Sequence, residues 1–195
     1  VKVQGRNFSG GAFDWVSGYS IMIGLALIAG YALIGATWLV MKTEDITQQW
    51  ARKSASYVLG FVGFFFVMVS IGMPLNYEYI QTLWFSKPIF YYLLPLPIIT
   101  VGLFILLWRD LHHKKHENRP FFSSIFIFLT AYIGLGVSIY PWIVPFKYTL
   151  WDAAASGPGL SLMLVGVIPL LPLILGYTGY CYYIFRGKSS HEHGY

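Results

Sequence analysis

The sequence predicts an all-α integral membrane protein with about five transmembrane helices. Of its 195 residues, 56% are hydrophobic and only 11% are charged, whereas a soluble domain carries about 25% charged residues. All charged residues and all histidines lie outside five stretches of 21 to 33 residues. About 20 apolar residues cross a bilayer as a helix, so each stretch is long enough to do so. The stretches are residues 15–41, 54–77, 88–108, 120–146 and 153–185.

This charge distribution excludes a soluble domain and a disordered chain. It also excludes a β-barrel, whose strands would alternate polar and apolar residues. We therefore treat residues 1–195 as one transmembrane helical domain, with residues 186–195 as a short flexible cytoplasmic tail.

The first stretch is rich in small residues. Ala26 and Gly30 are four residues apart, as are Ala32 and Ala36. Small residues at this spacing allow helix backbones to approach closely in lipid. We expect this helix to pack inside a bundle.

Prolines distinguish the later stretches. The second ends near Pro74, and Pro95 and Pro97 should bend the third, because proline removes a backbone donor. The last stretch has Pro158 near its start, with Pro169 and Pro172 inside it. Since its 33 residues exceed a straight crossing, we expect part of it to lie along the membrane interface.

The loops between the stretches divide the positive charges unequally. One side of the membrane receives nine Lys and Arg residues and the other receives four. Short loops rich in Lys and Arg face the cytoplasm. We expect the basic loops 42–53 and 109–119 and the C-terminus to be cytoplasmic, with the loop 76–87 and the N-terminus outside. The net charge of +5 then reflects topology, and we expect no nucleic-acid partner.

Reactive groups are absent from the five stretches. An ionisable side chain inside a span is a functional hypothesis by default, and we expect none here. Haem iron needs an axial ligand such as His or Met, and we interpret the methionines as packing residues. We expect no catalytic, cofactor-binding or metal-ligating residue in this chain. The five histidines lie outside the stretches, at His112, His113, His116, His191 and His193.

Two clusters could still be read as sites. The run His112, His113, Lys114, Lys115, His116 and Glu117 contains metal-ligand side chains, but adjacent lysines oppose cation binding and favour a solvated loop. The tail motif His191-Glu192-His193 favours an exposed, flexible segment. The single cysteine, Cys181, lies in an apolar run and is interpreted as a small buried hydrophobe.

Polar residues follow directly on the first stretch. Lys42 and Glu44 could anchor the end of the helix or pair with a partner subunit. From the residues alone, two functions remain open for the chain. It is either a scaffold within a larger complex or a transporter that works through backbone and aromatic groups.

Specific strings add a resemblance to a known family. The string at residues 10–15, GGAFDW, and the string at 30–44, GYALIGATWLVMKTE, resemble the central part of subunit II of cytochrome bd-type quinol oxidases. The closing residues 176–178, 182–183 and 185–188 resemble the C-terminal end of that subunit. Where many members have Gly after the Lys-Thr-Glu triplet, this chain has Asp45, which we interpret as a tolerated change.

The resemblance implies a function and a division of labour. The family oxidises quinol and reduces dioxygen to water, in the bacterial inner membrane, without pumping protons. Haems b and d and the main quinol site belong to subunit I. Subunit II would stabilise that haem-bearing partner, beside a small accessory membrane subunit. Because the family subunit is longer and this chain begins at Val1, we expect the C-terminal part of subunit II, comprising its second helix bundle and one extra helix. A stand-alone transporter or channel is the alternative.

Overall fold

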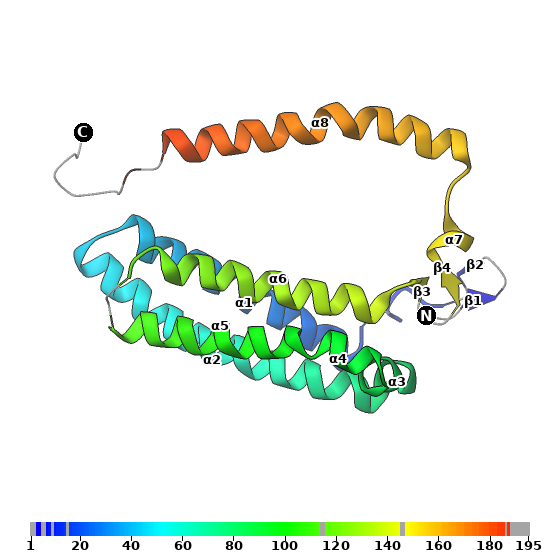
Figure 1. Cartoon of the computed structure of the whole chain (residues 1–195), viewed down its shortest axis with the longest axis horizontal. Helices are drawn as coiled ribbons and strands as arrows, with labels where there is room; N and C mark the ends of the chain where they lie inside the picture. Colours follow the sequence, from blue (N-terminus) through cyan, green and yellow to red (C-terminus); the bar gives the residue numbers. More distant parts are fainter. Residues whose placement is uncertain are drawn as a thin grey trace.

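The computed structural model confirms an all-α membrane protein (Figure 1). It describes residues 3–4, 7–8, 10–14, 16–113, 116–144, 147–185 and 187. Five of its helical segments are long and apolar enough to cross a membrane, with α4 and α5 counted as one segment. In chain order the elements are β1 (Val3–Gln4), β2 (Asn7–Phe8), α1 (Gly18–Lys42), α2 (Asp45–Asn76), α3 (Glu78–Phe85), α4 (Ile89–Leu93), α5 (Pro95–His113), α6 (Arg119–Ile139), β3 (Trp142–Val144), β4 (Tyr148–Thr149), α7 (Leu150–Ala153) and α8 (Gly157–Ile184).

Helices α1, α2, α5 and α6 form a bundle, which we call the four-helix unit (Figure 1). Helix α1 packs along α2 and α6, while α5 packs along α6 and α2. Each helix turns one aliphatic stripe toward a shared interior. With α8 beside it, this unit has the predicted arrangement of a bundle plus one extra helix. Its interior is filled by Leu33, Ala55, Leu59, Leu107, Leu111 and Ile127.

The small residues of α1 allow close packing, as the sequence predicts. Gly30 is buried, and a Cβ atom at this position would lie only 3.3 Å from the ring of Phe128 on α6. Near this contact, the hydroxyl groups of Thr37 and Ser124 lie 2.9 Å apart and join α1 to α6. The expectation that α1 lies inside a bundle is confirmed, although Ala32, from the other pair of small residues, is exposed.

The predicted basic loops are mostly helical, so the loop boundaries were wrong. Helix α2 begins at Asp45, and therefore most of the loop 42–53 forms its first turns. Helix α5 continues to His113 and α6 begins at Arg119, which leaves only residues 114–118 between them. Charge ends an apolar stretch without ending a helix, because Lys, Arg, Glu and Gln are good helix formers.

The opposite end of the unit also differs from the prediction. The expected loop 76–87 contains α3, whose Trp84 donates a hydrogen bond to the Ser138 hydroxyl at 2.9 Å. The fourth apolar stretch does not remain helical to residue 146. Helix α6 ends at Ile139, and Pro141, which lacks a backbone N–H, leads into the antiparallel pair of β3 and β4.

The prolines act in two ways. The third stretch is divided at Leu94, between α4 and α5, but Leu94 keeps helical dihedral angles of φ −53° and ψ −38°, so the bend expected at Pro95 and Pro97 stays a prediction. Helix α8 instead runs unbroken through Pro169 and Pro172. The expectation that part of this last stretch lies along the membrane interface stays a prediction.

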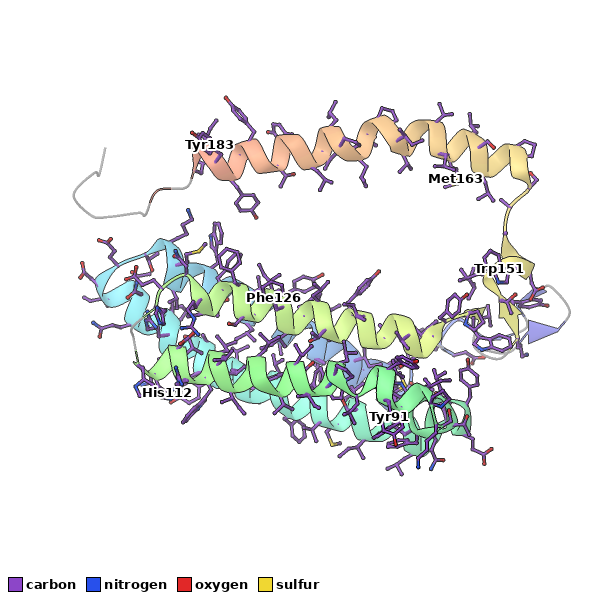
Figure 2. The ribbon with its side chains drawn as sticks, in the orientation of Figure 1. Tyr91, His112, Phe126, Trp151, Met163 and Tyr183 are labelled. Carbon is purple, nitrogen blue, oxygen red and sulfur yellow. The ribbon has the colours of Figure 1, made fainter. Side chains whose placement is uncertain are left out.

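Helix α8 runs beside the four-helix unit rather than within it (Figure 1). None of its residues is buried, and its side chains, including Met163 and Tyr183, project outward along its length (Figure 2). Its last turns approach α1, where the rings of Trp38 and Tyr182 meet edge to face at 5.6 Å. Such a helix is apolar on all sides, as expected for one surrounded by lipid or by other spans.

The turn between α1 and α2 contains one unusual backbone conformation. Asp45 has φ of 52°, in the left-handed region that costs most L-residues energy. Glycine adopts this conformation without cost, and aspartate tolerates it better than most residues. The geometry therefore explains why Asp45 stands where the resembling family often has glycine.

We expect substitutions at Asp45 to follow this backbone constraint. Asp45→Val should lower the free energy of unfolding by about 1–2 kcal/mol, while Asp45→Gly should leave it unchanged or raise it. Denaturant unfolding of the detergent-solubilised protein measures both. Thr47→Val, an exposed change within the helix two residues later, is the control. Equal stability of the Asp45→Val and Thr47→Val variants would contradict the left-handed backbone conformation of Asp45.

Candidate functional site

Charged and amide side chains gather at the end of the four-helix unit where α1 turns into α2 and α5 leads to α6. This is the end that carries His112, opposite the end that carries Tyr91 (Figure 2). We call this group the helix-end cluster, and it consists of Gln48, Arg52, Asp110, Glu117 and Arg119.

Arg52 is the centre of the cluster. It lies on the first turns of α2 and is only 4% exposed. Its Nη1 donates to the carbonyl oxygen of Asp110 at 3.1 Å, and its Nη2 donates to that of His116 at 3.2 Å. The last four carbonyl groups of a helix have no partner within the helix, and a positive charge at this end also suits the helix dipole. Arg52 therefore caps the C-terminal end of α5 from a neighbouring helix.

Asp110 contributes a second link. Its side chain is almost fully buried, and its Oδ2 lies 3.3 Å from Nε of Arg119 at the start of α6. Arg119 is about half exposed, so water screens part of this attraction. The pair still matters for structure, because a buried carboxylate without a cation would be costly.

Gln48 links the cluster to α1. Its Nε2 lies 3.0 Å from the carbonyl oxygens of both Val40 and Thr43, at the end of α1, and 3.2 Å from Oε1 of Glu117. Because Gln48 and Arg52 are four residues apart, they share one face of α2. One face of α2 thus holds the ends of two other helices.

These contacts define what the cluster can do chemically. Nη1 and Nη2 of Arg52 and Nε2 of Gln48 donate to backbone carbonyls, and the Asp110 carboxylate is held by the cation of Arg119. An arrangement of this kind holds helix ends in place and offers no activated nucleophile or general base. The described part of the chain also lacks any group of three or more His, Cys, Asp or Glu that could hold a metal ion.

The histidine-rich segment is divided between helix and connector. His112 packs against Trp108, with ring centroids 4.7 Å apart, and its Nδ1 lies 2.8 Å from the Trp108 carbonyl oxygen. His116 contributes its backbone carbonyl to Arg52, as described above. Lys114 and Lys115 lie outside the described residues, as do His191, Glu192 and His193 and all of the predicted tail 186–195 except Gly187.

Lys42 anchors a helix end within the chain, which was one of the two roles predicted for it. Its Nζ donates to the carbonyl oxygens of Phe185 at 3.0 Å and Gly187 at 3.3 Å, and lies 5.2 Å from the centre of the Trp38 ring. These contacts join the end of α8 to the end of α1. Cys181, on the same part of α8, is half-buried and not in a disulfide.

Sequence reasoning missed Arg52 and Asp110. Both residues lie outside the apolar stretches, but they are within α2 and α5 and are buried near the ends of these helices. Arg52 and Asp110 each lie two residues outside an apolar stretch. From the sequence, both were therefore assigned to loops. The four-residue spacing of Gln48 and Arg52 could have indicated that both lie on one face of a helix.

The fold and the helix-end cluster define a multi-pass membrane protein whose buried polar contacts hold helices together. Its family is identified by sequence comparison. The profile of cytochrome bd terminal oxidase subunit II matches residues 2–185, and the chain belongs to this family. Membership does not support the alternative of a stand-alone transporter or channel.

Individual relatives agree with this assignment. Cytochrome bd ubiquinol oxidase subunit 2 of Bacillus subtilis (strain 168) is 25% identical over 186 residues, which cover 92% of this chain and 53% of the relative. Cytochrome bd-I ubiquinol oxidase subunit 2 of Escherichia coli (strain K12) is 26% identical over 220 residues, covering 95% of this chain and 56% of the relative. The chain thus spans about half the length of these relatives.

The potential haem ligands His112, Met68 and Met163 lie away from the interior of the four-helix unit. A haem needs a cavity for its ring and a side chain to ligate its iron. The interior of the four-helix unit is instead filled by aliphatic side chains, which supply neither. His112 lies at the exposed end of α5 against Trp108, and Met68 and Met163 are exposed on α2 and α8.

We predict that Arg52 is needed for stability while its neighbour Lys53 is not. Arg52→Met removes two charge-assisted hydrogen bonds and leaves buried carbonyl groups unsatisfied, which should lower the free energy of unfolding by about 1.5–3 kcal/mol. Lys53→Met, an exposed change at the next position, should stay within about 0.5 kcal/mol of the original protein. Denaturant unfolding in detergent measures the difference, and similar losses in the two variants would contradict the capping role.

Proposed function

We propose that this chain is a non-haem-binding part of a terminal oxidase that oxidises quinol and reduces dioxygen to water. In the overall reaction, two quinols supply four electrons and four protons to one dioxygen, which becomes two waters. The family match over residues 2–185 carries the proposal. The aliphatic interior supports the further point that the chemistry takes place outside this chain.

The role of the chain in such a complex is structural. Haems b and d would lie on a partner, subunit I, together with the main quinol site, and a small accessory membrane subunit would complete the assembly. The helix-end cluster supports this role because it ties α1, α2, α5 and α6 into one rigid body. A rigid bundle of spans can hold a neighbouring subunit in register. We assign no catalytic, cofactor-binding or metal-ligating residue to this chain.

We also propose the orientation of the chain in a bacterial inner membrane. The contacts of Arg52 with His116 and of Lys42 with Gly187 bring the two basic segments and the end of α8 to one end of the molecule. Positive charge on short connections favours the cytoplasmic side. This end, with segments 42–53 and 109–119 and the C-terminus, is assigned to the cytoplasm.

Purification tests the proposed partnership. The full-length protein, expressed at natural level with an affinity tag, should copurify with a second large membrane subunit and with haem absorption bands of b and d type. The same preparation should consume dioxygen when a quinol is added. A pure preparation with neither a second subunit nor haem absorption would overturn the proposal.

Cysteine labelling tests the orientation. Asn118 and Lys87 are exposed and lie at opposite ends of the spanning helices. In a Cys181→Ser background, an impermeant thiol reagent added to intact spheroplasts should label Lys87→Cys and leave Asn118→Cys unlabelled. Asn118→Cys should react once the membrane is permeabilised. The opposite pattern would reverse the orientation.

A further inference from the structure

A groove lies between α2 and α5, next to the helix-end cluster. Its volume is about 560 Å³, which is within the range of small-molecule sites. The cluster itself does not account for this groove, since Asp110, Glu117 and Arg119 do not line it. The lining residues are Gln49, Trp50, Arg52, Lys53, Ser56, Tyr57, Leu111 and His112.

The groove is positively charged. Arg52 and Lys53 line it together with the imidazole of His112, and none of its lining residues in the described chain is acidic. The nearby carboxylates are engaged elsewhere, since Asp110 pairs with Arg119 and Glu117 accepts from Gln48. Charge complementarity therefore favours an anionic ligand.

Arg52 also has an unused donor. Two of its nitrogens bind backbone carbonyls, but its Nε is buried and has no hydrogen-bond partner. A buried donor without an acceptor is costly. Guanidinium groups bind phosphate oxygens strongly, with several donors in a fixed plane. The charge of Arg52 at the wall of the groove would attract a phosphate group bound there.

The surroundings of the groove are those of a membrane interface. Trp50 and Tyr57 line it and are exposed, and aromatic residues of this kind lie at the level of lipid headgroups. Toward the middle of the spans, the same face of α2 continues with exposed Phe61, one turn beyond Tyr57. On α5, exposed Trp108 lies one turn before His112. A polar, cationic groove thus leads directly into an apolar surface.

We propose that this groove binds an anionic phospholipid. The phosphate group lies against Arg52 and Lys53, and the acyl chains extend along the faces of α2 and α5 that carry Phe61 and Trp108. The apolar continuation is what favours a lipid over inorganic phosphate, because a free phosphate would make no use of it. The proposal goes beyond the oxidase function and does not depend on it.

Lipid titration by native mass spectrometry tests the proposal. The full-length protein, with the subunits that copurify, is delipidated in detergent and titrated with phosphatidylglycerol or phosphatidylcholine. Phosphatidylglycerol should bind more tightly. Lys53→Gln should weaken its binding about fivefold, since one Lys near an anionic surface contributes about a factor of that size. Lys53 is exposed, so this variant should fold.

Lys87→Gln is the matched control, because it removes the same charge from an exposed position at the other end of the spans. It should bind phosphatidylglycerol as the original protein does. Equal binding of the two lipids, or equal losses in the Lys53 and Lys87 variants, would overturn the proposal. Displacement of phosphatidylglycerol by millimolar inorganic phosphate would also overturn it, and would indicate a site for free phosphate instead.

Discussion

The hydrogen bonds from Arg52 to the end of α5 are the contacts on which the arrangement of this bundle depends. A backbone carbonyl buried within the protein needs a hydrogen-bond partner, and helix ends leave carbonyl groups without one inside the helix. Arg52 supplies these partners for the end of α5 and for the segment between α5 and α6. Gln48, one turn away on α2, supplies them for the end of α1. The aliphatic side chains of the interior make no directional contacts and cannot fix these helix ends by themselves.

Polar contacts hold elements together elsewhere in the described chain as well. Its buried charges are used for structure, and its interior is aliphatic. Helix α8 is also held by side-chain contacts at its end. It contributes no buried residue, yet Lys42 and Trp38 fasten its last turn to α1. An apolar helix fastened in this way presents most of its surface to lipid or to other subunits.

The sequence predicted the spans well because apolar length and missing charge are direct consequences of the bilayer. It predicted the close packing around Gly30 for an equally local reason. It failed at the helix ends. Residues 45–53 and 109–113 looked like loops because they carry charge, whereas they continue α2 and α5. The pair of β3 and β4 was missed because β3 lies at the end of an apolar stretch and β4 follows Lys147, outside every apolar stretch.

By itself, the sequence determined that this is a five-span membrane protein of the cytochrome bd subunit II type, because composition and specific strings are properties of the chain alone. Only the tertiary structure decided what Arg52 and Asp110 do. Arg52 binds the carbonyl groups of Asp110 and His116, which are 58 and 64 residues further along the chain. Asp110 pairs with Arg119, which lies on the next helix. Contacts between distant residues depend on how helices pack, and no local pattern in the chain specifies that packing.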